Sequence, residues 1–185
     1  EFGYGIYPNV VTALEFERML SSTGPWAGEL VRPSDRRHPR RIAFIQCVGS
    51  RDVRGSGATP GGSAEGGLPG GSSGEAEPVP YCSAVCCMFS TKQAIIAREH
   101  DPDVECTVFY IDLRAQGKNF ERYVESAERQ FGVTFRRSMV SGVREDPATR
   151  DLTVTWTGPD GRVREEVFDL VVLATGLRPP AGARD

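Results

Sequence analysis

Three apolar runs constrain the fold of this chain more than any other feature of its sequence. They lie at Ile42–Ile45, Val108–Ile111 and Leu170–Ala174, and each is nearly continuous instead of alternating with polar residues. Strands that are apolar on both faces are typical of parallel sheets covered on both sides by other elements. Because segments with helical periodicity lie between the first runs, we expect an α/β chain whose helices cross over between parallel strands.

Gly, Pro and Asp residues mark the boundaries of the expected elements. We expect helices over Asn9–Leu20, Cys86–His100 and Lys118–Phe131. We expect strands over Arg41–Cys47, Glu105–Asp112, Val133–Arg137, Met139–Arg144, Leu152–Thr157, Arg162–Phe168 and Leu170–Ala174. The turn residues between Met139 and Phe168 favour an antiparallel β-meander. The pattern predicts a single α/β domain over 1–185, with a Rossmann-like parallel sheet, a β-meander and a final central strand.

Residues 55–80 differ in composition from the rest of the chain. They are almost entirely Gly, Ser, Pro, Ala and Glu, so they lack the apolar surface needed to offset the entropy of ordering them. We expect a disordered insertion within the domain. Loop closure becomes only slightly more costly with length, so the insertion can separate Cys47 from Cys82 in sequence without separating them in space.

Four cysteines lie where the expected elements meet. Cys47 ends an expected strand, whereas Cys82, Cys86 and Cys87 lie just before or at the start of an expected helix. Doubly wound folds place their chemistry where strand ends face helix starts, and four thiolates are what an iron–sulfur cluster needs. The alternative is that these are small buried core residues, although the neighbouring Cys86 and Cys87 point in different directions. Cys106, inside an expected strand, is expected to pack in the core.

Composition excludes several classes of function. The net charge of −3 gives no basic surface for nucleic acid, and no apolar run approaches the ~20 residues of a membrane span. The first residues lack the features of a signal peptide. We therefore expect a cytoplasmic protein whose cysteines serve metal or redox chemistry instead of disulfides. Because the chain does not begin with Met, we expect it to be a piece of something longer.

Several segments resemble one known family. They are Tyr7-Pro-Asn-Val-Val-Thr-Ala-Leu-Glu-Phe-Glu-Arg-Met-Leu20, Ile42-Ala-Phe-Ile-Gln-Cys-Val-Gly-Ser-Arg-Asp52, Tyr81-Cys-Ser-Ala-Val-Cys-Cys-Met-Phe-Ser-Thr-Lys-Gln-Ala94 and Phe109-Tyr-Ile-Asp-Leu-Arg-Ala115. These segments closely resemble the A subunit of heterodisulfide reductase and its bacterial relatives. The resemblance covers most of the chain, but the Gly/Ser/Pro-rich segment departs from the family's shorter connection.

The resemblance implies a thioredoxin-reductase-like flavoprotein that carries FAD and [4Fe–4S] clusters and transfers electrons to a heterodisulfide or a comparable acceptor. The chain lacks the G-x-G-x-x-G turn that cradles FAD pyrophosphate, so it resembles the second, inserted domain. The family's cluster ligands carry over to Cys47, Cys82, Cys86 and Cys87. The implied partners are the FAD-binding domain of the same polypeptide, which binds most of the FAD, and other electron-transfer subunits. We expect no catalytic residue here and an inert chain in isolation.

Two other functions stay open at this point. The first is a nicotinamide-nucleotide-binding domain, in which Asp112 takes the place of the acidic ribose ligand. Its first turn offers one Gly where the fingerprint needs three, so we expect Asp112 to be a solvated strand end. The second is a non-catalytic domain with a structural zinc site, which the adjacent Cys86 and Cys87 fit poorly. Arg51 and Arg114 are candidate counter-charges for an anionic cluster or a flavin.

Overall fold

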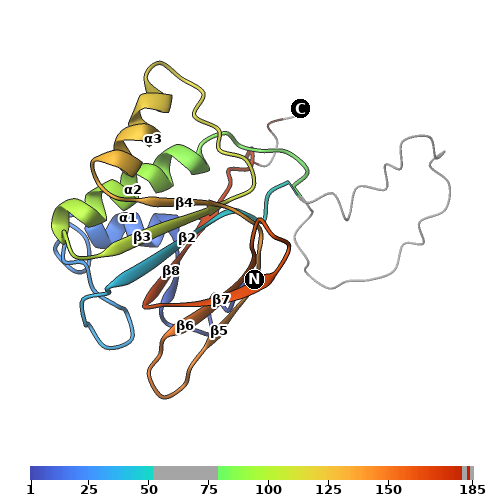
Figure 1. Cartoon of the computed structure of the whole chain (residues 1–185). Helices are drawn as coiled ribbons and strands as arrows, with labels where there is room; N and C mark the ends of the chain where they lie inside the picture. Colours follow the sequence, from blue (N-terminus) through green and yellow to red (C-terminus); the bar gives the residue numbers. More distant parts are fainter. Residues whose placement is uncertain (52–78, 181–182, 184–185) are drawn as a thin grey trace.

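The computed structural model describes residues 1–51, 79–180 and 183 of the 185-residue chain. Within these residues the chain forms a five-stranded parallel sheet, a three-stranded antiparallel sheet and three helices (Figure 1). The predicted parallel sheet with a β-meander is thereby confirmed. The predicted insertion at 55–80 lies almost wholly outside the described residues.

The elements follow one another in an α/β order and then as a run of strands. They are β1 (Val10–Thr12), α1 (Ala13–Leu20), β2 (Arg41–Val48), α2 (Cys86–His100), β3 (Glu105–Tyr110), α3 (Phe120–Arg129), β4 (Thr134–Arg137), β5 (Val140–Glu145), β6 (Leu152–Thr157), β7 (Val163–Phe168) and β8 (Leu170–Thr175). The parallel sheet has the order β1-β8-β2-β3-β4, and the antiparallel sheet has the order β5-β6-β7. The last strand of the chain therefore lies inside the parallel sheet, as expected, beside β2.

The predicted helix over Asn9–Leu20 is wrong in its first part. Val10–Thr12 is a short parallel strand whose residues pair with Val171–Leu173 of β8. The two valines are buried there, so pairing along the free edge of β8 outweighs the local helical pattern. Thr12 then starts the helix with a capping box, because its hydroxyl accepts from the Glu15 N–H at 3.2 Å and the Glu15 carboxylate accepts from the Thr12 N–H at 2.7 Å.

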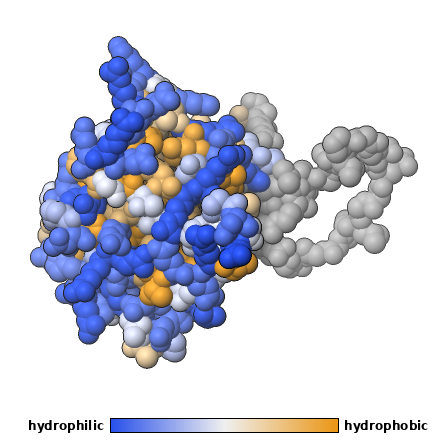
Figure 2. All heavy atoms as spheres, in the orientation of Figure 1, coloured by the Kyte–Doolittle hydropathy of each residue, from blue (hydrophilic) through white to orange (hydrophobic). Residues whose placement is uncertain are grey.

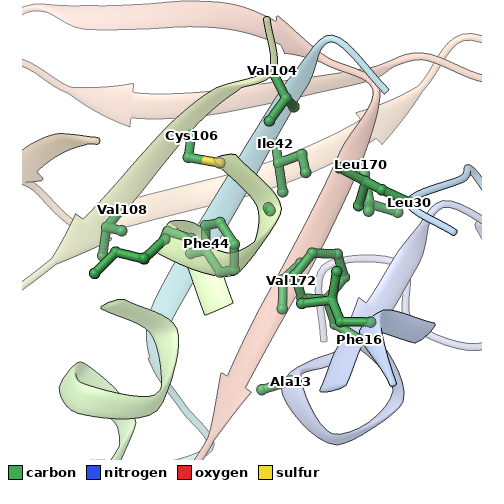
Figure 3. Packing of buried hydrophobic residues seen from close by; sticks show 14 of the residues in the cluster. Ala13, Phe16, Leu30, Ile42, Phe44, Val104, Cys106, Val108, Leu170 and Val172 are labelled. Atoms are coloured by element: carbon green, nitrogen blue, oxygen red, sulfur yellow. The ribbon is translucent and has the colours of Figure 1, made fainter. Parts of the chain in front are cut away.

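The parallel sheet is covered on both faces, as its apolar strands predict. Along β2, Ile42 and Phe44 face the helices, while Ala43 and Ile45 face the meander. Figure 3 shows the helix side, where side chains from α1, β2, β3 and β8 gather, and Cys106 lies among them at 1% exposure. Cys106 is thus a core residue, as expected from its place in a strand.

A buried arginine ties the meander to the parallel sheet. Arg32 is 4% exposed, and its guanidinium pairs with Asp151 at 2.7 Å and Asp169 at 3.4 Å. It also donates to the Thr149 carbonyl at 2.7 Å. Asp169 leads into β8 and accepts in turn from the backbone N–H of Arg41 at 2.8 Å. One charged cluster therefore joins the start of β2, the start of β8 and the turn between β5 and β6.

The outer surface is mostly polar. Figure 2 shows hydrophilic side chains over most of the face seen in Figure 1, with smaller apolar patches between them. None of the described helices combines the length and the apolar character needed to cross a membrane.

A four-cysteine site at the carboxyl edge of the parallel sheet

Cys47 lies where β2 becomes irregular. Pairing of β2 with β8 shifts register between Ile45 and Val48, and Cys47 takes the left-handed conformation with φ of +61°. Arg51 and Ala84, on the two loops beside the site, have φ of +59° and +60°. For residues with a side chain this conformation costs roughly 1–2 kcal/mol, and such strain is concentrated at functional sites. Here it accompanies an irregularity in β2, after which Val48 pairs again with Thr175 of β8.

The other three cysteines approach the same edge from the start of α2. Helix α2 begins at Cys86, and its N-cap residue, Val85, makes no side-chain capping bond. The first N–H groups of a helix and its dipole favour negative charge nearby. Cys86 and Cys87 are buried at 7% and 4% exposure, whereas Cys82 on the preceding loop is half-buried. The helix start therefore presents two buried sulfurs toward the ends of the strands.

Polar contacts join the Cys86 and Cys87 sulfurs to the end of β8, to the loop after β3 and to the loop before α2. Cys86 Sγ lies 3.6 Å from the Thr175 carbonyl at the end of β8, and 3.6 Å from Ser83 Oγ. Cys87 donates to the Asp112 carbonyl at 3.8 Å and accepts from the Arg114 N–H at 3.4 Å. Each sulfur is thus held by the carboxyl end of a parallel strand.

Gly176 allows the loops to close over the end of β8. A Cβ atom on this residue would lie 2.3 Å from Ser50 Oγ and 3.1 Å from Ser83 Oγ. Ser50 lies three residues after Cys47 and Ser83 directly follows Cys82, so a larger residue would force at least the Ser50 hydroxyl to move. The glycine therefore serves the assembly of the site.

Burial raises the pKa of the Cys47, Cys86 and Cys87 thiols above the usual value. Nearby thiols raise it further, since Cys82 acts on all three and Cys47 acts on Cys86 and Cys87. A hydrogen bond from Arg51 lowers the pKa of Cys47 in part. The Cys47, Cys86 and Cys87 thiols are therefore held in their neutral form more strongly than a free thiol, and a bound cation would favour their thiolates.

The donor set suits a thiolate-bound group, although the sulfurs do not form a closed ligand shell. Among the described residues, no group of three or more His, Cys, Asp or Glu side chains is close enough to hold a metal ion. Gln46, beside Cys47, is buried at 6% exposure, and within the described part of the chain neither polar atom of its amide has a hydrogen-bond partner. Buried polar groups without partners are uncommon. Four soft sulfur donors beside an unsatisfied amide fit an iron–sulfur group.

Asp112 follows β3 and its side chain is 47% exposed, but it also has charged partners. Its Oδ2 accepts from Arg114 Nε at 3.0 Å and lies 3.8 Å from Arg51 Nη1. The carboxylate is thus engaged by two guanidinium groups from two different loops. Neither of these contacts, nor those of Thr175 and Ser83 with Cys86, was anticipated from the sequence.

A cavity of about 720 Å³ opens next to Cys47. It lies between the ends of β2 and β3 and the start of the meander, and its lining includes Ser50, Phe109, Met139 and Val143. The edge of the sheet that carries the half-buried Cys47 is therefore accessible to a further molecule or domain.

Comparison with known proteins gives relatives over almost the whole chain. The chain is 41% identical over 97% of its length to the second iron-sulfur A subunit of the CoB–CoM heterodisulfide reductase of Methanopyrus kandleri. It is 42% identical over 97% of its length to the corresponding iron-sulfur A subunit of Methanocaldococcus jannaschii. In both cases the chain spans 24% of the relative's length.

No family model matches the chain. Among solved structures, the sulfide:quinone oxidoreductase of Aquifex aeolicus is similar at a TM-score of 0.40 and 11% identity, over 76% of this chain and 26% of that one.

Proposed function

We propose that this chain, which is homologous over nearly its whole length to a segment of the A subunit of heterodisulfide reductase, is an electron-transfer domain of a flavin- and iron–sulfur-dependent oxidoreductase. The observation that carries this proposal is the placement of four cysteines at one edge of the sheet, with Cys47 near the end of β2 and Cys82, Cys86 and Cys87 before or at the start of α2. The names of the relatives describe them as iron–sulfur proteins. We infer that the four cysteines are the ligands of one [4Fe–4S] cluster.

The residues of the chain have distinct tasks in this proposal. A bound [4Fe–4S] cluster supplies one-electron transfer, and its potential depends on net charge, hydrogen bonds to sulfur and solvent exposure. The backbone N–H groups of Ala84 and Arg114 donate to the sulfurs of Cys82 and Cys87 at 3.3 and 3.4 Å. These bonds orient the thiolates and stabilise their negative charge.

The proposal also includes FAD and protein partners that exchange electrons with this chain. The flavin is bound mainly by another domain of the same polypeptide, and other electron-transfer subunits exchange electrons with it. The cavity beside Cys47 gives such a group an approach to the site. The chain by itself holds no catalytic residue and is inert in isolation.

The two alternative functions fit the geometry less well. A nicotinamide nucleotide needs a glycine-rich turn and a free acidic residue for its ribose, but the turn after β2 has a single glycine, Gly49, and Asp112 is paired with Arg114 at 3.0 Å. A structural zinc site prefers ligands separated by two to four residues, whereas Cys86 and Cys87 are adjacent.

Metal analysis tests the proposal directly. The anaerobically reconstituted chain should contain iron and acid-labile sulfide in equal amounts and show the broad brown absorption of an iron–sulfur protein. Stoichiometric zinc without sulfide would favour the structural site instead. Saturable quenching or enhancement of NADH fluorescence by the chain would favour the nicotinamide-binding function.

A further inference from the structure

Asp112 occupies a position that connects the loops of the four-cysteine site. It follows β3, which pairs with β2, so it lies at the same edge of the sheet as Cys47. One of its two carboxylate oxygens, Oδ2, lies 3.0 Å from Arg114 Nε and 3.8 Å from Arg51 Nη1. These two arginines come from the loops that follow β3 and β2. The carboxylate is therefore an ion-pair partner that the two loops share.

Each arginine is also linked to a cysteine. The backbone N–H of Arg51 donates to the Tyr81 carbonyl, next to Cys82, at 3.2 Å. The backbone N–H of Arg114 donates to Cys87 Sγ at 3.4 Å. Both guanidinium groups lie near enough to Cys47 to lower the pKa of its thiol.

We propose that Asp112 is a positioning residue, which fixes the guanidinium groups of Arg51 and Arg114 beside the four cysteines. The side chains of both arginines are partly exposed, at 26% and 37%. A long charged side chain without a fixed partner gains rotamer freedom and hydration by moving into water. The carboxylate prevents this movement and keeps two positive charges next to the thiolates.

The direction in which loss of the Asp112 carboxylate shifts the reduction potential separates this role from a simple charge effect. Asp112 carries a negative charge, so its removal alone would make the site more positive and would raise the reduction potential of an anionic cluster. If Asp112 acts through the arginines, its removal releases two positive charges and lowers the potential. The two explanations thus predict opposite shifts.

The first test measures the midpoint potential of the reconstituted chain by redox titration, and it rests on the proposed function. Asp112→Asn should lower the potential, and Asp112→Glu should restore part of the loss. Asp103→Asn is the matched control because this exposed acid lies before β3, at the opposite edge of the sheet, and it should leave the potential unchanged. In an Arg51→Gln, Arg114→Gln background, Asp112→Asn should cause no further decrease. A higher or unchanged potential in Asp112→Asn would overturn the proposal.

The second test needs no cluster. In the metal-free chain, the thiols react with the dianionic 5,5′-dithiobis(2-nitrobenzoate) and with the neutral 4,4′-dithiodipyridine, and the ratio of the two rates reports the local charge. Asp112→Asn should lower this ratio by about two- to fivefold, the scale of one partly screened charge at short range. An unchanged or higher ratio would contradict the positioning role. A chain that binds no iron but shows the lower ratio would refute the proposed function and leave the role of Asp112 supported.

Discussion

The substitution Arg32→Met tests how the meander is held on the parallel sheet. Methionine keeps most of the volume of the side-chain stem but removes the guanidinium that pairs with Asp151, Asp169 and Asp35 at 2.7, 3.4 and 3.3 Å. The Arg32 side chain is 5% exposed, whereas these three acids are 33%, 24% and 29% exposed. Breaking a fully buried pair costs about 3–5 kcal/mol. Because water reaches the acids that stay behind, we expect a loss of about 2–3 kcal/mol here.

Thermal and urea unfolding of the chain measure this loss. For a domain of this size, 1 kcal/mol corresponds to roughly 2–4 °C in Tm, so Arg32→Met should lower Tm by roughly 4–12 °C. Arg162→Met is the control, since the Arg162 side chain is 85% exposed and lies 4.0 Å from Asp160, an exposed geometry worth about 0–1 kcal/mol. Equal stability losses in the two variants would refute the assignment of Arg32 as a buried clamp.

Two more predictions concern the helix side of the fold. Phe44 of β2 is fully buried against the helices, so Phe44→Ala should reduce the free energy of unfolding by about 3–5 kcal/mol. A urea midpoint close to that of the unchanged chain would contradict its place in the core. Burial raises the pKa of Glu17, but hydrogen bonds from Lys92 and Gln93 outweigh it and hold the pKa below the usual value. Because the pKa of Glu17 is lower in the folded chain than in the unfolded chain, its ionised carboxylate stabilises the fold above about pH 4. This stability is lost as the pH falls and the carboxylate is protonated. Glu17→Gln should therefore destabilise the chain at neutral pH and much less at about pH 3. A destabilisation that stays constant between these pH values would exclude this ionic contribution.

The sequence predicts most of the regular elements because their signals are local and strong. The bounds of α2 follow from the start of apolar periodicity at Cys86 and from the Asp101-Pro102 stop, and those of β6 follow from the alternation in Leu152–Thr157. Strand β1 escapes prediction because its three residues acquire their conformation from pairing with β8. A short segment of this kind carries no period of its own that distinguishes it from the helix that follows.

The positions of the four cysteines on the expected elements are predictable from the sequence, but the contacts around them are not. The sequence places Cys47 at a strand end and the other cysteines at a helix start, and both positions are found in the structure. The contacts of Cys86 with Thr175 and of Cys87 with Arg114 depend on which strand ends become neighbours in the sheet. The irregular end of β2 at Cys47 likewise depends on its register with β8, which single-sequence patterns do not contain.

The ligand assignment is tested most directly by the iron content of two cysteine variants after anaerobic reconstitution. Cys87 lies at the start of α2 among the four cysteines, whereas Cys106 is enclosed in the core of the sheet and burial raises the pKa of its thiol to about 12. The unchanged chain should bind about four iron and about four sulfide ions. Cys87→Ala should lose most of this iron, and Cys106→Ala should retain it. Equal loss in both variants, or full iron content in Cys87→Ala, would contradict the four-cysteine cluster site.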